Sequence, residues 1–120
     1  MDTSAWVRAL RGVPAYRDGL AELRYEKALG GHELVHGELL AGDRGGRAAF
    51  LSDYQRLPWA PRLPHFEVAE FVRLRRLQGR GAGWLDLHLL AAALVGRWRL
   101  WTADQRLAEL AGELGIGYRP

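Results

Sequence analysis

The sequence predicts an α/β fold built around a short, mainly parallel β-sheet. Segments with the periodicity of amphipathic helices alternate with short apolar runs that are typical of strands, and this alternation favours a parallel sheet covered by helices. The chain has 120 residues, which indicates a single domain over residues 1–120. Hydrophobic residues make up 48% and charged residues 26%, and these values are ordinary for a globular protein.

Residues 83–105 give the clearest part of this prediction. We expect an apolar helix over residues 84–95 and a short strand over residues 99–102. Asp86 lies in the first turn of this helix, and Asp104 follows the strand. The helix would be about 18 Å long, and the strand would run back in the opposite direction. The two carboxylates are therefore expected at one edge of the sheet, where α/β proteins bind ligands.

The other segments follow the same alternation, and glycine or proline separates most of them. Gly12 and Pro14 end the first helix, and Gly42 ends the third. Residues 57–64 contain three prolines, so we expect a connector there with at most a short edge strand. The other helices are expected over residues 5–10, 14–24, 32–41, 44–55, 65–78 and 104–114. Weaker strand signals cover residues 25–29 and 116–118.

The composition excludes several classes of protein. Cysteine is absent, which excludes disulfides, thiolate metal sites and cysteine nucleophiles. The N-terminus has neither the basic segment nor the apolar core of a signal peptide. The longest apolar run, residues 89–96, is far shorter than a membrane span. We therefore expect a soluble, cytoplasmic protein without membrane contacts.

Four acidic residues differ from the others by their position. Asp2, Asp86 and Asp104 lie beside helix starts, and Glu38 lies on a helix between apolar neighbours. Helix capping or a solvated position would explain each of them separately. Together they predict an acidic cleft, in which like charges raise one another's pKa values unless a cation neutralises them. Carboxylate oxygens suit Mg²⁺ or Mn²⁺, which promote phosphodiester hydrolysis.

The chain is basic, with a net charge of +3 and a pI near 9.8. Its basic residues are arginines apart from Lys27. Codon usage alone would explain this preference for arginine, and the preference also suits phosphate binding. One dense group near the end of the 65–78 helix is expected either to contact RNA phosphates or to form a solvated basic face. The group consists of Arg73, Arg75, Arg76 and Arg80.

Competing motifs are weak. The glycine-rich segment 79–83 lacks the Gly-Lys-Ser/Thr of a P-loop. His32 and His36 have a helical spacing that could bind a metal, but no third ligand is evident. His88 is expected to pack in the core or to cap a helix. Ser4 has no evident base near it, which argues against a serine hydrolase.

Four segments resemble, in order, the sequence blocks of PIN-domain ribonucleases of the VapC toxin type. These segments are residues 2–7, 37–39, 81–91 and 100–107. The resemblance covers essentially the whole chain. It implies a three-layer α/β/α sandwich on a central parallel sheet and a Mg²⁺- or Mn²⁺-dependent endoribonuclease activity.

The resemblance also implies roles for individual residues. The family's catalytic and metal-binding carboxylates fall on Asp2, Glu38, Asp86 and Asp104. Thr102 falls on a supporting hydroxyl position, and Ser4 is predicted to support the site as well. The family's apolar first strand precedes its first aspartate, whereas only Met1 precedes Asp2 here, so we expect a truncated first strand.

Family membership further implies partners. The expected substrate is tRNA or rRNA, the expected inhibitor is a cognate antitoxin whose C-terminal segment blocks the cleft, and the expected assembly is a homodimer. The alternative is a catalytically inactive PIN-like module that binds RNA or protein, which the short N-terminus favours. A phospho-receiver domain would need a lysine late in the chain, and the only lysine is Lys27.

Overall fold

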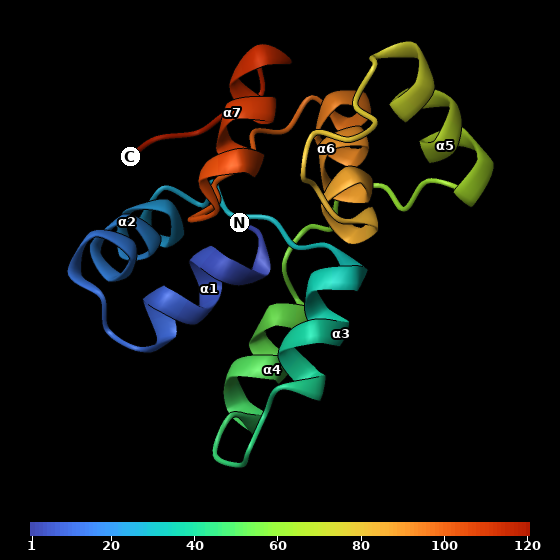
Figure 1. Cartoon of the computed structure of the whole chain (residues 1–120). Helices are drawn as coiled ribbons and strands as arrows, with labels where there is room; N and C mark the ends of the chain where they lie inside the picture. The colour runs from blue at the N-terminus through green and yellow to red at the C-terminus, as the bar shows by residue number, and fades with distance from the viewer.

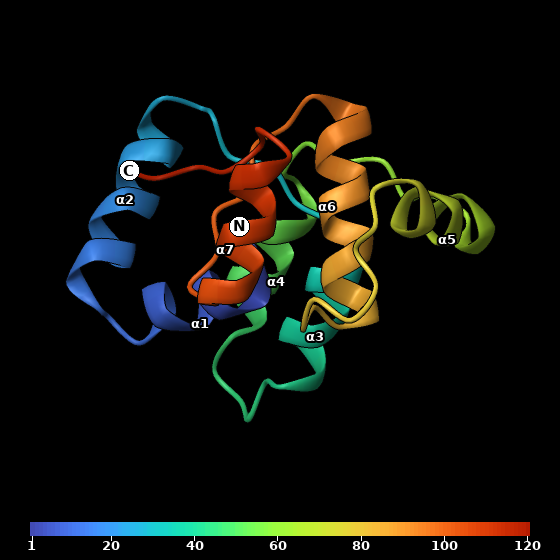
Figure 2. The same cartoon turned by 45° about the horizontal axis from the view of Figure 1, so that its top comes forward.

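The computed structural model describes residues 1–120 as seven α-helices joined by extended segments (Figure 1). The helices are α1 (Thr3–Leu10), α2 (Pro14–Tyr25), α3 (Glu33–Ala41), α4 (Ala48–Gln55), α5 (His65–Leu74), α6 (Trp84–Gly96) and α7 (Gln105–Glu113). Helix α1 packs against α2 and α3, α3 packs against α4, and α5 packs against α6. In both views α6 lies between α7 and α5, and α5 lies at the outside of the molecule (Figures 1 and 2).

The predicted three-layer α/β/α sandwich is wrong, because no β-sheet forms. Two isolated parallel bridges stand in its place, one between Gly31 and Trp59 and one between Leu100 and Gly117. The strands expected over residues 99–102 and 116–118 shrink to the second bridge, and the one expected over residues 25–29 pairs with nothing. The architecture is therefore mainly helical.

Local packing explains why the extended segments do not form a ladder. The indole of Trp98 lies against the backbone of Gly30, where a Cβ atom would come within 1.4 Å of the ring. A side chain, and not a hydrogen-bonded strand, thus connects the Gly31 segment with the Leu100 segment. The partner segment of Gly31 begins at Pro58, which has no N–H to donate to a ladder.

The N-terminal residues add little to this backbone pairing. The Asp2 N–H donates to the Trp101 carbonyl oxygen at 3.0 Å, and this is the one backbone hydrogen bond between the N-terminal segment and the segment around Trp101. Asp2 then starts α1. The position of Asp2 consequently depends on its side-chain contacts.

The predicted helices are confirmed, with shifts at their ends that follow from local backbone geometry. Asp2, His32 and Asp104 accept hydrogen bonds at the starts of α1, α3 and α7, and Pro14 is the first residue of α2. The helix expected over residues 44–55 begins only at Ala48, because Gly45 and Gly46 adopt positive φ angles. The one expected over 65–78 ends at Leu74. No helix is long and apolar enough to cross a membrane.

Helix α6 is apolar on all sides and is the most deeply buried helix. Every residue from Leu87 to Ala93 is buried, including His88, which packs in the core as predicted. The aromatic part of the core links α1 to α4, because the Trp6 ring lies 5.3 Å from Phe50 and 5.5 Å from Tyr54. A rigid α6 fixes the position of Asp86 in its first turn.

Candidate functional site

Asp2 is the most firmly held of the predicted acids. The residue is only 4% exposed, and its Oδ1 accepts a hydrogen bond from the Ala5 N–H at 3.0 Å. The Ser4 hydroxyl lies 2.8 and 2.9 Å from its two carboxylate oxygens, and the Thr102 hydroxyl donates to Oδ2 at 2.6 Å. These charge-assisted hydrogen bonds offset the cost of burying a carboxylate. Ser4 and Thr102 therefore hold both oxygens of the Asp2 carboxylate, and their supporting role in a reaction stays a prediction.

Ser4 and Thr102 also connect the start of α1 with the start of α7. Their hydroxyl oxygens are 3.3 Å apart. Ser4 accepts a hydrogen bond from the Ala103 N–H at 3.0 Å, and Thr102 accepts one from the Asp104 N–H at 3.0 Å. Asp104 is exposed and caps α7, where its Oδ1 accepts from the Arg106 N–H at 2.9 Å. One network of hydrogen bonds thus sets the distance between the segments that carry Asp2 and Asp104.

Glu38 is held by Thr3, which directly follows Asp2 at the start of α1. The Thr3 hydroxyl donates to Oε1 of Glu38 at 2.5 Å, across the contact between α1 and α3. Glu38 is exposed, so its carboxylate is open to solvent while its position is fixed. The contact of Thr3 with Glu38 was not predicted from the sequence, where only the position of Thr3 directly after Asp2 could have indicated it.

Asp86 differs from the other three acids, because it lies half-buried in the first turn of α6 and accepts no hydrogen bond from a side chain. Burial raises its pKa above the ordinary value, and the charges of Asp2 and Asp104 raise it further. Glu38 adds a smaller effect in the same direction, while a backbone hydrogen bond with Gly83 opposes them. All four predicted acids therefore share one electrostatic environment.

The arrangement fits a divalent cation in its chemistry, although no three histidine, aspartate or glutamate side chains form a ready-made metal cluster. The donor set consists of carboxylates alone, which hard cations such as Mg²⁺ and Mn²⁺ prefer. Asp2 and Asp104 already accept hydrogen bonds from the protein. The charge of Asp86 is the one that the protein leaves uncompensated, and its raised pKa expresses this.

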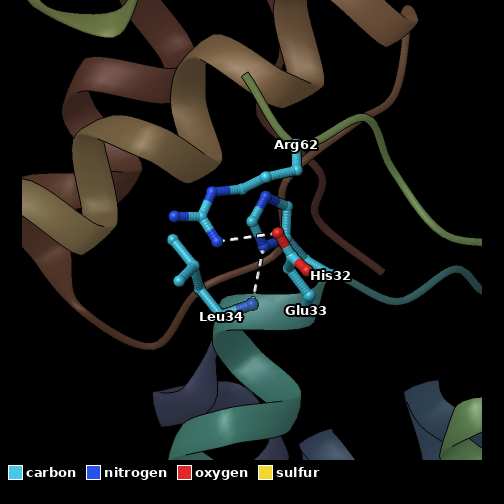
Figure 3. Close-up of polar contacts among 4 residues, drawn as sticks. All are labelled: His32, Glu33, Leu34 and Arg62. Carbon is cyan, nitrogen blue, oxygen red and sulfur yellow. Dashed lines mark hydrogen bonds and ion pairs between the residues drawn. The ribbon is translucent and has the colours of Figure 1, made fainter. Parts of the chain in front are cut away.

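The histidines that could have suggested another metal site have structural roles. Figure 3 shows His32 at the start of α3, where its Nδ1 accepts from the Leu34 N–H at 3.0 Å. Beside it, Arg62 reaches Glu33 at 2.7 Å. Burial lowers the pKa of His32 to about 4, and the positive charge of Arg62 lowers it as well. His36 stacks on the buried ring of Tyr54, and no third ligand joins His32 and His36 to form a metal site.

The predicted RNA-binding arginines are only partly free. Arg73 pairs with a glutamate one turn earlier in α5. Arg80 pairs with Glu113 at 2.7 Å, which raises the pKa of Arg80 and lowers that of Glu113. Arg75 and Arg76 lie exposed after the end of α5. Two of the four side chains thus already have a carboxylate partner, and their contact with RNA stays a prediction.

Comparison with known proteins gives one clear result. Over 117 residues the chain is 41% identical to Ribonuclease VapC32 of Mycobacterium tuberculosis (strain ATCC 25618 / H37Rv), and the match covers 97% of this chain and 92% of that protein. The same figures hold for Ribonuclease VapC32 of strain CDC 1551 / Oshkosh. No family model and no solved structure matches the chain. Identity at this level over nearly the full length of both chains indicates common descent.

Proposed function

Because this chain belongs to the VapC ribonuclease family, we propose that it hydrolyses RNA phosphodiester bonds as the toxin of a toxin–antitoxin pair. The observation that carries the proposal is the hydrogen-bond network of Ser4 and Thr102, which holds Asp2 beside the segment of Asp104. Burial raises the pKa of Asp86, and the charges of Asp2, Asp104 and Glu38 raise it further. Such a cluster is poorly suited to a structural role and well suited to binding a cation beside a phosphate. Activity on RNA would take place in the cytoplasm.

We propose that the site works with Mg²⁺ or Mn²⁺. Asp86 would hold the ion together with Asp2 and Asp104, and Glu38 would complete the site or order the attacking water. The bound ion would supply Lewis-acid polarisation of the phosphate and a lower pKa for a bound water. The Ser4 and Thr102 hydroxyls are hydrogen-bonded to Asp2, and the Thr3 hydroxyl is hydrogen-bonded to Glu38. A water molecule would therefore attack the phosphodiester in line with the leaving oxygen.

The surrounding residues keep the acids in place during this reaction. Ser4 and Thr102 hold both oxygens of Asp2, which fixes the direction of its remaining lone pairs. Thr3 fixes Glu38 at the open side of the site. Preorganised carboxylates need little rearrangement when substrate binds, and this is where electrostatic catalysis gains most of its effect.

The proposal extends to partners that the family implies. The substrate would be a tRNA or rRNA, an antitoxin protein would inhibit the enzyme by covering the cleft, and the active form would be a homodimer. A gene for a small protein with a DNA-binding N-terminus beside the gene for this chain would support the toxin role.

Asp86→Asn tests the enzyme proposal, because it removes the uncompensated charge and keeps the shape of the side chain. We expect RNA cleavage with Mn²⁺ to fall at least about 100-fold. Calorimetric titration should show Mn²⁺ binding by the wild type that the variant loses. Asp18→Asn is the matched control, since Asp18 lies exposed on α2 and pairs with Arg17, and it should cleave RNA like the wild type. If the wild type cleaves no RNA with Mn²⁺ present, the chain is a binding module and the enzyme proposal is wrong.

A further inference from the structure

A cavity of about 570 Å³ opens directly beside the acidic site, between α1, α3 and the start of α4. One of its walls carries Glu38 together with Thr3, which holds that carboxylate. Three arginines also line the cavity, Arg11, Arg44 and Arg47, after which we call it the arginine pocket. The pocket therefore adjoins one acid of the site, and its three arginines outnumber its two carboxylates, Glu38 and Asp43.

The arginines of this pocket have no carboxylate partner. Arg11, Arg44 and Arg47 are absent from every ion pair within 4.0 Å, although Asp43 lines the same cavity. The Asp43 carboxylate instead accepts a hydrogen bond from the Gly45 N–H at 3.0 Å. Guanidinium groups that gather around a hollow without partners suit an anionic ligand, because they bind phosphate oxygens in a fork-like geometry.

The backbone turn between α3 and α4 brings these side chains to the pocket. Gly45 and Gly46 have φ angles of +113° and +85°, which residues with a Cβ atom rarely adopt. The tight turn places Arg44 before the glycines and Arg47 directly after them, at the mouth of one cavity. A larger residue at either glycine would strain this turn.

The pocket also has an apolar wall. Val7 and Leu10 contribute from α1, and Leu39 and Phe50 contribute from α3 and α4. The Phe50 ring is anchored by its contact with Trp6, at 5.3 Å between ring centroids. Stacking of a nucleobase on an aromatic ring is worth about 1–3 kcal/mol per base and tolerates any sequence. The volume falls within the range of roughly 300–1,000 Å³ that small-molecule sites occupy.

We propose that the arginine pocket is an RNA subsite that holds the nucleotide next to the bond being cleaved. The arginines bind its phosphate, and its base lies against Phe50 and the aliphatic wall. The inference rests on the proposed ribonuclease function, because it needs the scissile phosphate at the adjoining acids. It moves the main RNA contact from the Arg73–Arg80 region, where two arginines are paired, to a cavity where the arginines are free.

A binding experiment that needs no cleavage tests the subsite. The Asp86→Asn protein serves as the background, and fluorescence anisotropy measures its affinity for a single-stranded RNA of twelve mixed nucleotides at several salt concentrations. Arg11→Gln with Arg44→Gln should weaken binding by roughly tenfold to hundredfold at low salt and should flatten the slope of log affinity against log salt by about 1.4. Both side chains are exposed, so the fold is retained.

Two matched variants sharpen the result. Arg24→Gln with Arg56→Gln removes two exposed arginines at the far ends of α2 and α4 and should change the RNA affinity less than about threefold. Arg11→Lys with Arg44→Lys keeps the charge but not the planar fork, so the salt slope should return while the affinity recovers only in part.

The outcomes separate this inference from the proposed function. Unchanged RNA affinity in the Arg11→Gln, Arg44→Gln protein overturns the subsite, even if the wild type cleaves RNA. Unchanged RNA affinity together with a lost affinity for a twelve-residue glutamate peptide assigns the pocket to an acidic partner protein and also overturns it. A loss of RNA affinity in this protein, together with RNA cleavage by the wild type, supports the subsite. The same loss with a wild type that cannot cleave leaves an RNA-binding pocket but overturns its place beside a scissile bond.

Discussion

Asp2 and Asp86 belong to the same acidic site, yet the protein surrounds them in opposite ways. Asp2 is buried and accepts hydrogen bonds from Ala5, Ser4 and Thr102. Asp86 is half-buried, accepts no hydrogen bond from a side chain and has a pKa raised by burial and by the other acids. The protein itself thus stabilises the charge of Asp2, whereas the charge of Asp86 would be stabilised by the cation that we propose.

This comparison separates structural from functional roles within one site. A carboxylate whose oxygens are satisfied by the chain stabilises the fold, and its loss leaves buried donors without partners. A carboxylate that is crowded by like charges costs stability in the empty protein and stabilises a bound cation. Substitution by asparagine, which keeps the side chain's shape, should therefore affect the two positions differently.

The largest expected effect is on stability at Asp2. Asp2→Asn should lower the free energy of unfolding by about 2 kcal/mol, because an amide NH₂ cannot accept from the Thr102 hydroxyl and leaves it unpaired. Asp86→Asn should change the free energy of unfolding by less than about 1 kcal/mol. The variant relieves repulsion by the other acids, but it also loses the attraction of a carboxylate to the positive end of the α6 dipole. Urea unfolding in EDTA, followed by tryptophan fluorescence, measures both.

The Asp18→Asn protein again provides the control, because this exposed residue should change the free energy of unfolding by less than about 0.5 kcal/mol. Equal losses of stability at Asp2 and Asp86 would contradict the comparison. Such a result would mean that the hydrogen bonds around Asp2 contribute nothing to the free energy of unfolding.

The second effect is on stabilisation by a cation. At a Mg²⁺ concentration ten times the dissociation constant, binding should raise the free energy of unfolding of the wild type by about 1.4 kcal/mol. The Asp86→Asn protein should lose most of this gain, because its site lacks the charge that the protein leaves uncompensated. Thermal unfolding with Mg²⁺ or EDTA checks this without any assay of activity. A full Mg²⁺ effect in the variant would place the ion elsewhere.

The helices could be predicted from the sequence because their signals are local. Periodic apolar residues and stops such as Gly12, Pro14 and Gly42 depend on neighbours in the chain, and Asp104 proved to be a helix cap. The absence of a sheet could not be predicted, because a ladder depends on pairing between distant segments. The contact of Trp98 with Gly30, which takes the place of such pairing, connects residues that are far apart in sequence.

The four acids could be singled out from the sequence, but the structural reason for their proximity differs from the predicted one. The sequence pattern predicts Asp86 and Asp104 at the edge of a sheet, and that sheet does not form. The charge of Asp104 still acts on Asp86, because α6 and α7 begin at the same end of the molecule (Figure 1) and the Ser4 and Thr102 hydroxyls connect α1 to α7. The arginine pocket could not be predicted, since the tertiary contacts of α3 with α1 and α4 create it.

The smallest expected effect is the pH dependence that Asp86 gives to stability. Its folded-state pKa is raised, so between the unfolded value of 3.8 and the folded value the native protein binds more protons than the unfolded chain. Ionisation of Asp86 therefore costs stability as the pH rises through this window. Relative to the wild type, the Asp86→Asn protein should gain stability with rising pH, by less than about 1 kcal/mol in total. Urea unfolding in EDTA from pH 3.5 to 7 measures the difference. A difference that stays constant with pH would show that neither burial nor the other acids raise the pKa of Asp86.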